Sequence, residues 1–348
     1  MPVEHVLLKK ETTLGTWATP SAAYPFKSWS VDNGVNWGDL RDTGTNRSLR
    51  NQFLQHKAVS GSFSANAYWT QLGLFFLAAG FTRVTNTQPD AVNSATVYEH
   101  GMLQDDTAVL KALSVQIKKT SAKAHNLRGV VINKLKLGCK AKEPVAIDGD
   151  YVAIDEAITG GTWDDAASAP AVVASPTYFG ASTGIFTFKH AVLTYGGTPA
   201  LDGTSKSFSI SGGSNLAIVE SAEITLDNGI DSPHFLGAYV PGNHIPQNRS
   251  ITGRFDIDWS TLPETYYSAM KAGTELALQL IFTGPVISDD EKWVLSWTLP
   301  AITLNAANFP DAMGDQARRK QSVEFTAHHD ATSGYDSGVT LIDTEASY

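Results

Sequence analysis

The stretch SAEITLDNGI, Ser221–Ile230, has a counterpart near the start of the chain in SWSVDNGVNW, Ser28–Trp37. In both, an alternation of apolar and polar residues leads into Asp-Asn-Gly and then an aliphatic residue. Alternation with period two is typical of a strand with one buried face. Asp-Asn-Gly is typical of a tight turn or bulge that tolerates positive φ. The sequence therefore predicts the same strand ending twice, with Asn33 and Asn228 separated by 195 positions in a chain of 348 residues.

Length and composition bound the class of protein. A chain of 348 residues favours about two domains, and its 42% hydrophobic residues can fill their cores. The net charge of −9 argues against a duplex-binding protein with a broad basic footprint. The one cysteine, Cys139, excludes an intrachain disulfide. The first residues lack the apolar core of a signal peptide, and the longest apolar run, Leu72–Phe81, is about half of a membrane span. We therefore expect a soluble protein made in a cytoplasm.

Two further stretches show the strand period clearly. In VSGSFSANAYW, which begins at Val59, apolar residues and glycine alternate with Ser and Asn, and in ITGRFDIDW, which begins at Ile251, they alternate with Thr, Arg and Asp. Such two-faced strands belong to antiparallel sheets rather than to a buried parallel sheet. Helical patterning is scarce and is confined to Trp69–Gly80 and Ser260–Gly273, where Ser260 is a plausible N-cap. The predicted fold is mainly β, with about one short helix in each half.

The two halves agree in the order of their elements. After the Asp-Asn-Gly strand comes a long polar segment, a strand with Gly-x-Phe (Gly61 and Gly253), a short helix, and a strand with a central glutamine (Gln116 and Gln279). A strand carrying Leu135 and Leu137 is matched with one carrying Ile302 and Leu304. The spacing falls from 195 to 192, then to 163 and 167, as expected when loops diverge while element order holds. We expect a first domain over residues 1–160, a linker over 161–183 that is rich in small residues, and a second domain over 184–348.

The chain resembles the tail tube proteins of long-tailed bacteriophages. The resemblance is carried by KKETTLGTWATPSAAYPF (Lys9–Phe26), by Asn46–Gly80 with its Gly-x-Phe strand and following helix, by GIFTFKHAVLTYGG (Gly184–Gly197), and by SAEITLDNGI. It extends along nearly the whole chain, twice over.

The resemblance implies a fold and a role. In that family the domain is an antiparallel β-sandwich or barrel flanked by a helix, and its sheets join those of neighbouring subunits into rings that stack into a hollow tube for DNA. Six domains commonly close one ring, so two domains in each chain imply a homotrimer. The implied partners are further copies of the chain and other tail proteins such as the tape measure, terminator and tip, with DNA only as passing cargo. The implied location is the virion tail, after assembly in the host cytoplasm, with no membrane contact and no cofactor.

A tube that conducts DNA should present few unpaired cations to it, because each neutralised phosphate adds a salt-dependent attraction. The polar faces of the two most regular strands therefore form the candidate lumen face. They comprise Ser60, Ser62, Ser64 and Asn66 in the first half, and Thr252, Arg254, Asp256 and Asp258 in the second. The neighbouring carboxylates of Asp256 and Asp258 are expected to offset the charge of Arg254.

A basic segment runs from Lys111 to Lys142 with nine Lys and Arg residues and no acidic residue. It could be a solvated strand face, a nucleic-acid patch, or a surface complementary to an acidic neighbouring subunit. We favour the third interpretation, because opposed potentials fix register and partner choice, and expect the segment to lie outside the lumen or to be paired with carboxylates of a neighbour. The candidate inter-subunit basic face comprises Lys118, Lys134, Lys136 and Lys140.

The long segments after each Asp-Asn-Gly, residues 36–57 and 231–248, exceed ordinary hairpin turns. They carry apolar residues that a purely solvated loop would not need. The candidate inter-ring loop residues are Phe53, Leu54, Phe235, Leu236 and Tyr239.

Motifs for catalysis and metal binding give no coherent site. His328, His329 and Asp330 are adjacent, but neighbouring residues in a strand point to opposite faces and cannot easily converge on one ion. The sequence has no Gly-rich phosphate loop and no Gly-x-Ser-x-Gly elbow. We therefore predict no catalytic, cofactor or metal site. Two alternatives remain: a secreted or surface β-sandwich that binds carbohydrate through its eight Trp, and a β-rich enzyme whose site residues are distant in sequence.

Overall fold

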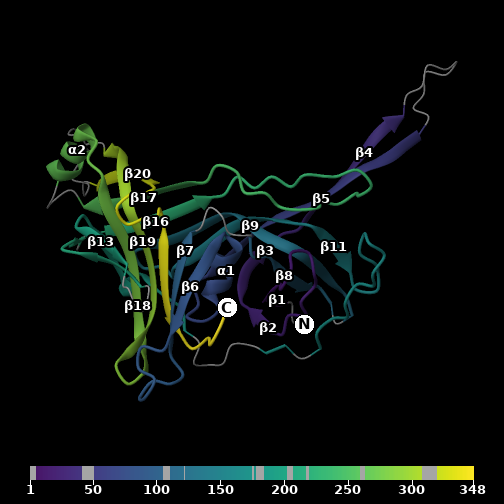
Figure 1. Cartoon of the computed structure of the whole chain (residues 1–348), viewed down its shortest axis with the longest axis horizontal. Helices are drawn as coiled ribbons and strands as arrows, with labels where there is room; N and C mark the ends of the chain where they lie inside the picture. The colour runs from purple at the N-terminus through teal and green to yellow at the C-terminus, as the bar shows by residue number, and fades with distance from the viewer. Residues whose placement is uncertain are drawn as a thin grey trace.

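The computed structural model is mainly β, as the period-two strands predicted (Figure 1). It describes residues 5–40, 51–104, 110–120, 122–174, 176–177, 184–201, 207–216, 219–258, 263–307 and 320–348. In Figure 1, β1, β3, β8 and β11 gather on one side and β13, β17, β18, β19 and β20 on the other, with the N-terminal strands far from helix α2. Within these residues, no helix is long and apolar enough to cross a membrane.

The first half carries strands β1 to β11 and one helix. Their bounds are β1 His5–Lys10, β2 Ala22–Tyr24, β3 Phe26–Trp29, β4 Asp32–Leu40, β5 Asn51–Asn66, α1 Leu72–Ala78, β6 Phe81–Thr87, β7 Tyr98–Gln104, β8 Leu113–Lys118, β9 Ala124–Lys140, β10 Ala146–Ala153 and β11 Asp155–Ile158.

The second half begins with a short 3-10 helix and carries the remaining strands. Their bounds are η1 Phe188–His190, β12 Ala191–Tyr195, β13 Thr198–Leu201, β14 Phe208–Ser211, β15 Ser214–Leu216, β16 Val219–Asp227, β17 Ser250–Asp258, α2 Pro263–Ala272, β18 Leu276–Ser288, β19 Glu291–Ala307, β20 Lys320–His328 and β21 Gly338–Asp343.

The two halves have the same antiparallel connectivity. In the first, the pairing order is β2, β1, β8, β9, β10, β5 and then β3 with β4. In the second, β15, β12, β18, β19, β20, β17 and β16 take these positions in turn. β11 pairs with β9 as β21 pairs with β19. β9 and β19 each pair with different strands at their two ends, and within the described residues these pairings connect nineteen strands into one sheet, with β13 and β14 paired separately.

The Gly-x-Phe motif has the same packing role in each half. A Cβ atom at Gly61 would lie 2.8 Å from the ring of Tyr151 on β10, and one at Gly253 would lie 2.2 Å from the ring of Phe325 on β20. In both halves the glycine leaves room for an aromatic ring from the adjacent strand. Because a Cβ cannot approach a ring so closely, glycine at this position fixes how the central strands pack.

Register corrects one predicted match between the halves. Val130 lies opposite Leu113 on β8, and Ile302 lies opposite Leu276 on β18. The partner of Ile302 in the first half is therefore Val130, five residues before the predicted Leu135. β19 is buried along most of its length, so apolar letters alone could not set its register.

The fall in spacing from 192 to 163 residues has a structural cause. The first half contains an additional hairpin, β6 and β7, between its helix and β8, whereas β18 directly follows α2. This hairpin does not extend the sheets of its own half. β7 pairs with the C-terminal strand β21, so the hairpin continues the sheet of the second half.

The two Asp-Asn-Gly stretches differ in the structure. Asp227 ends β16 as predicted, but Asp32 begins β4, so the first stretch lies inside the β3–β4 chain segment and does not end it. Asn228 is buried and its side-chain amide donates to the carbonyl oxygens of Ala79 (2.9 Å) and Ile132 (3.1 Å). Asn33 is exposed and its amide contacts Glu156. The second motif therefore caps helix α1 of the first half, a role that its turn-like sequence did not indicate.

Helix α1 lies in the middle of the molecule (Figure 1). All seven of its residues are buried, which fits a helix that is apolar on every side. The ring of Phe76 meets Trp297 of the second half edge-on at 5.4 Å, and the Tyr348 ring packs on Gly73. One hydrophobic cluster therefore continues from one half to the other. Helix α2 begins at Pro263, and the predicted cap Ser260 lies outside the described residues.

The described part of the predicted linker packs on the first half. Trp163 is buried, its ring lies 5.8 Å from that of Trp17, and the Arg128 guanidinium lies over it at 4.6 Å. Gln116 holds the next stretch, since its amide donates to the carbonyl of Ala171 (2.9 Å).

Gly253→Ala tests the Gly-aromatic packing. The new methyl group would meet Phe325 at 2.2 Å and the Glu223 carbonyl oxygen at 2.5 Å, so we expect a loss of about 1–3 kcal/mol in the free energy of unfolding. Gly138→Ala is the matched control, because its nearest neighbour is 3.9 Å away and the expected change is under about 0.5 kcal/mol. Urea denaturation measures both, and equal effects would contradict the packing role.

Candidate functional site

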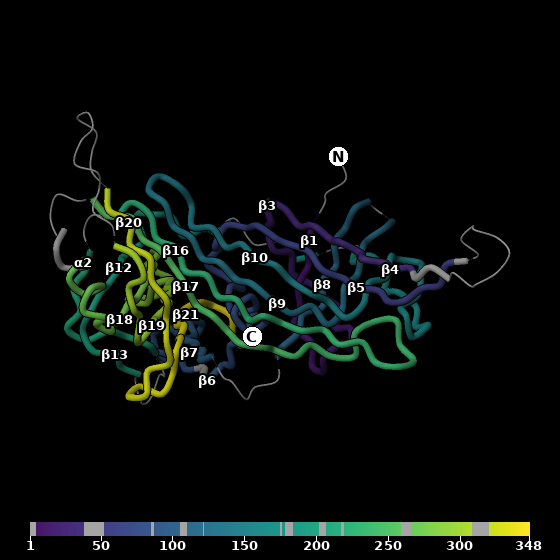
Figure 2. The backbone as a smooth tube through the Cα atoms, turned by 90° about the horizontal axis from the view of Figure 1, so that it is seen from above, coloured from purple at the N-terminus to yellow at the C-terminus, as the bar shows by residue number. Residues whose placement is uncertain are grey.

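The two halves are joined by a strand junction. β16 of the second half pairs antiparallel with the C-terminal part of β9 of the first half, from Ser221 opposite Lys140 to Asp227 opposite Lys134. β9 pairs with β10 on its other side over the same stretch. The sheets of both halves therefore form one surface, and Figure 2 shows β10, β9, β16 and β17 side by side across it.

One face of this surface is polar and crosses the junction. Directly opposed residues share a face, so the register places the polar residues of six neighbouring strands together. The members of this polar sheet face are Ser60, Ser62, Ser64 and Asn66 of β5, Asp148 and Asp150 of β10, Lys134, Lys136 and Lys140 of β9, Ser221, Glu223, Thr225 and Asp227 of β16, Thr252, Arg254, Asp256 and Asp258 of β17, and Lys320, Ser322 and Glu324 of β20.

The structure thus brings the two predicted strand faces together and adds others to them. Residues of β5 and β17 that are far apart in sequence lie on one side of one sheet. Lys134, Lys136 and Lys140 lie on that same side, between them, and not on a separate surface. Local periodicity predicted the alternation within each strand but not the order of strands, which depends on long-range pairing.

The lysines of β9 meet carboxylates of β16. Lys136 Nζ lies 2.6 Å from Glu223 Oε2, and Lys134 Nζ lies 3.3 Å from Asp227 Oδ2. The carboxylates that meet these two lysines therefore belong to the second half of the same chain, whereas the prediction placed them on a neighbouring subunit. Each of these side chains is about 40% exposed, so each pair contributes at most about 1 kcal/mol. Charge here favours the pairing of these two strands over others more than it stabilises them.

The remaining cations of the polar sheet face also have acidic partners. Arg254 lies 3.0 Å from Asp256, Lys140 lies 3.1 Å from Glu143, and Lys320 contacts Glu220. Burial raises the pKa of Asp256, but hydrogen bonds from Ser221 and Arg254 act against burial and the net pKa is lowered. Asp256 is thus held as an anion beside Arg254, as the strand pattern predicted. With five cations against seven carboxylates, the face is slightly acidic and charge-paired.

Lys118 lies elsewhere. It ends β8 opposite His5 of β1 and borders a cavity beside β3, away from the polar sheet face. The four predicted lysines therefore form two groups.

The opposite face of the junction is apolar and buried. Ile224 lies opposite Leu137, and Leu226 lies opposite Leu135, each at most 1% exposed. Cys139 faces this core, where burial raises the pKa of its thiol to about 11. At neutral pH the thiol is therefore protonated, which is the state of a core residue and not of an activated nucleophile.

β4 and β5 extend beyond the sheet as a projecting arm (Figure 1). Phe53 and Leu54 lie in strand β5, so the predicted loop over residues 36–57 is a hairpin strand for most of its described length. The segment 229–249 runs back along this arm, and the Lys57 amide donates to the Tyr239 carbonyl oxygen at 2.7 Å. His234 Nε2 lies 3.0 Å from the Lys57 carbonyl oxygen. The two segments predicted to reach outward thus pack on each other.

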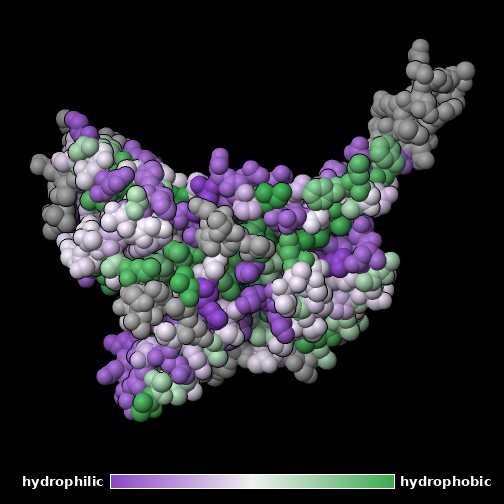
Figure 3. Space-filling model, in the orientation of Figure 1, coloured by the Kyte–Doolittle hydropathy of each residue, from purple (hydrophilic) through white to green (hydrophobic). Residues whose placement is uncertain are grey.

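Large apolar side chains are exposed on the arm and on the segment beside it, and Figure 3 shows hydrophobic surface at the base of the arm. They are Val35, Trp37, Phe53, Phe235, Leu236 and Tyr239, and Leu236 is fully exposed. Contiguous exposed apolar surface of this kind marks an interaction site. Trp37 was not singled out from the sequence, because the strand that presents it was expected to be loop.

His244 anchors the segment 229–249. Its Nε2 lies 2.9 Å from the Gly129 carbonyl oxygen and its Nδ1 lies 2.8 Å from the Ser232 hydroxyl. Burial lowers its pKa to about 4 although the Gly129 contact opposes the shift. The imidazole is therefore neutral near pH 7 and holds the segment by hydrogen bonds alone.

Other residues considered from the sequence have ordinary surroundings. His328 Nε2 lies 2.6 Å from the Thr303 hydroxyl, while the Asp330 carboxylate accepts from the Ser333 amide in a turn. In the described part of the chain, no group of three His, Cys, Asp or Glu could hold a metal ion. Among the tryptophans whose burial is described, only Trp37 is more than a third exposed, which disfavours a sugar-stacking platform.

Two substitutions separate the apolar and ionic contributions to the junction. Ile224→Ala removes buried methyl groups opposite Leu137, and we expect a loss of about 2–5 kcal/mol in the free energy of unfolding. Glu223→Ala breaks the ion pair with Lys136, and we expect a loss below about 1 kcal/mol. Thermal or urea denaturation compares the two. A larger loss for Glu223→Ala would show that the ion pairs, and not the core beneath them, hold the halves together.

Comparison with known proteins identifies the family of the chain. A family model described as phage tail tube protein matches residues 4–327. No curated protein matches the chain. Among solved structures, the chain is similar to a mutant of the Hcp1 protein from E. coli EAEC 042 pathovar, with 13% identity over 44% of this chain and 96% of that one and a TM-score of 0.22. The family match spans both halves and the junction between them, so this chain belongs to the phage tail tube protein family.

Proposed function

We propose that the chain forms homotrimeric rings that stack into the hollow tail tube through which phage DNA is ejected. A structural role in the phage tail follows from the family. The observation that carries the ring is the β9–β16 junction, where one half adds its edge strand to the sheet of the other. If the junction repeats between chains, a closed ring leaves no sheet edge exposed. Rings of six domains, as the family resemblance implies, then need three chains.

We further propose that the halves are two copies of one domain, over residues 1–160 and 184–348, joined by the linker 161–183. The shared pairing order of their strands supports this. The buried helix α1 and the β6–β7 hairpin then act as fixed links between the copies.

The polar sheet face is proposed to line the lumen. Its cations each have an acidic partner, so passing phosphates meet hydroxyls, carboxylates and neutralised lysines. An unpaired cation would instead add a salt-dependent attraction, and several together would hold the DNA. The apolar face below is already filled by the core, which leaves the polar face for the channel.

The arm is proposed to contact the next ring. Phe53, Phe235, Leu236 and Tyr239 remain exposed although the two segments that carry them pack together. Stacking would cover this surface. The proposed partners are thus further copies of this chain, with the tape measure, terminator and tip proteins at the ends of the tube.

The stoichiometry is tested by symmetry-resolved electron microscopy of purified assemblies. We expect rings or tubes with three chains and pseudo-sixfold symmetry. Six chains in a ring would contradict the trimer, and compact single particles at all concentrations would contradict ring assembly.

Charge reversal tests the lumen. Asp256→Lys with Asp258→Lys reverses two half-buried charges, and because Asp256 also bonds Ser221 and Arg254, normal tube assembly by the variant is established first. We expect slower DNA ejection, most strongly at low salt, where phosphate attraction is least screened. Asp290→Lys with Glu291→Lys, in the β18–β19 turn, makes the same change in charge away from the polar sheet face. Ejection at the unmodified rate by both variants at low salt would contradict this placement.

A further inference from the structure

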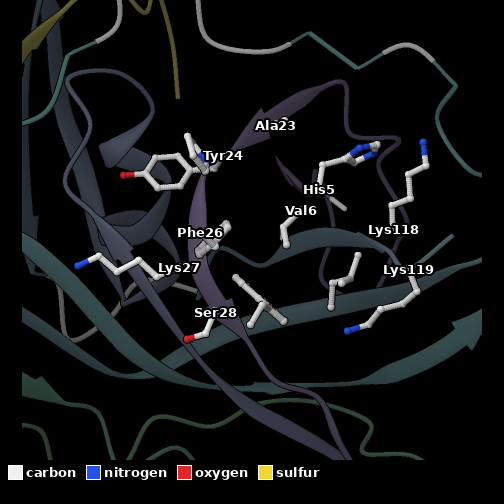
Figure 4. A pocket seen from close by; sticks show the side chains of 12 residues that line it. His5, Val6, Ala23, Tyr24, Phe26, Lys27, Ser28, Lys118 and Lys119 are labelled. Atoms are coloured by element: carbon white, nitrogen blue, oxygen red, sulfur yellow. The ribbon is translucent and has the colours of Figure 1, made fainter. Parts of the chain in front are cut away.

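A cavity of about 440 Å³ opens in the first half between β1, β3 and β8. Tyr24 and Phe26 line its wall, and Lys27, Lys118 and Lys119 reach its rim from two sides (Figure 4). Lys27 and Lys119 are exposed and Lys118 is half-buried. We call it the first-half cavity. Because its rim carries three lysines, a ligand that fits this cavity should be negatively charged.

The second half has a cavity at the corresponding place, and it is less than half as large. This second-half cavity, of about 200 Å³, lies between β12, β16 and β18, and Cys139 and Ala141 of the first half form part of its wall. The Ala141 amide donates to the Glu220 carbonyl oxygen at 2.8 Å, and the Phe188 amide donates to that of Glu143 at 3.2 Å. The chain that follows β9 therefore occupies the second half at this place.

Register shows that the two cavities are equivalent. Trp29 lies opposite Phe63, as Ala222 lies opposite Phe255. Just before these equivalent residues, each strand has a β-bulge that shifts its register. The bulge lies between Phe26 and Ser28 in β3, and between Val219 and Ser221 in β16. Lys27 and Glu220 are thus the same bulge residue in the two halves. The carbonyl group that accepts from Ala141 in the second half has its counterpart at Lys27.

The same reasoning identifies the segment that should fill the first-half cavity. Phe63 and Phe255 are equivalent, and they lie opposite Gly149 and Val323. On their other sides, Gly149 lies opposite Leu135 and Val323 lies opposite Ala307. Leu135 and Ala307 are therefore equivalent residues of β9 and β19. With Val130 and Ile302, this gives a constant spacing of 172 residues between β9 and β19. Residues 139–143 then correspond to residues 311–315, which lie outside the described residues.

The two segments differ in charge, and so do the bulge residues Lys27 and Glu220 that border the two cavities. Residues 139–143 read Cys-Lys-Ala-Lys-Glu, whereas 311–315 read Asp-Ala-Met-Gly-Asp. In the second half, the segment 139–143 meets the backbone carbonyl of Glu220, whose carboxylate contacts Lys320. In the first-half cavity, Lys27 takes the place of Glu220. Gln116 and Gln279 set a spacing of 163 residues between β8 and β18. At this spacing, Lys118 and Lys119 take the places of Ile281 and Phe282.

We propose that the first-half cavity binds residues 311–315 of a second copy of this chain, with Asp311 and Asp315 meeting Lys27, Lys118 and Lys119. The inference rests on the proposed ring. Each ring then alternates two junctions of opposite polarity: lysines on an acidic edge within a chain, and aspartates on a basic edge between chains. A basic segment is repelled by the basic cavity, so the polarity prevents the segment after β9 from entering it.

Paired cysteines test the proposed register. Ser221 and Lys140 are directly opposed within the chain, so their counterparts Ser28 and Ala312 should be opposed between chains. Directly opposed residues of an antiparallel pair are close enough for a disulfide. In a Cys139→Ala background, Ser28→Cys with Ala312→Cys should give covalent trimers on oxidation, seen on non-reducing gels. The control, Ser221→Cys with Lys140→Cys, should link within one chain and keep the mass of a monomer.

The outcomes separate the two proposals. Rings that assemble while the 28–312 pair stays unlinked and the control pair links would overturn the cavity assignment and leave the ring intact. Failure of the unmodified protein to form rings would overturn both.

Charge reversal gives an independent measurement. Lys118→Glu with Lys119→Glu should raise the concentration for half-maximal ring assembly by about tenfold or more. Adding Asp311→Lys with Asp315→Lys to this variant should lower that concentration back towards the value of the unmodified protein. Lys271→Glu with Lys292→Glu, on α2 and β19, is the matched control. Equal assembly of all variants, or no rescue by the second pair, would overturn the proposal.

Discussion

The ladder between β9 and β16 is the interaction on which the rest of the structure depends. A sheet edge presents unpaired amides and carbonyls that must be satisfied, and here the edge of one half is satisfied by the long strand of the other. The core beneath it is continuous, with Leu137 packed opposite Ile224. The ion pairs above it lie in water and contribute little energy, but their signs favour one partner strand.

The two halves share a framework and differ where they meet their surroundings. The Gly-aromatic contacts, the bulge at Lys27 and Glu220, and the order of pairing are common to both. The β6–β7 hairpin, the arm and the charges around the two cavities are not. The differences between the halves are therefore concentrated at the surfaces by which one half meets the other, or by which it would meet another chain.

Sequence periodicity predicted the mainly β class, the two helices and the alternation of buried and polar residues along β5 and β17, because these depend on local spacing. It could not predict that Lys134 and Lys136 share a face with Asp256, because that depends on pairing between residues far apart in the chain. It matched Leu135 with Ile302 as equivalent residues of the two halves, because a fully buried strand has no polar residues that would fix its register. It assigned residues 36–57 to loop because an exposed arm strand such as β4 lacks a buried face.

Helix α1 has the further consequence that the two halves are not independent modules. Its apolar surface is divided between both halves, and its last turn is capped by Asn228 of the second. Neither half on its own could cover Phe76 or satisfy the Ala79 carbonyl. The chain should therefore gain and lose its structure in a single cooperative transition, and a nascent first half must wait, with this helix unprotected, until the ribosome has delivered the second.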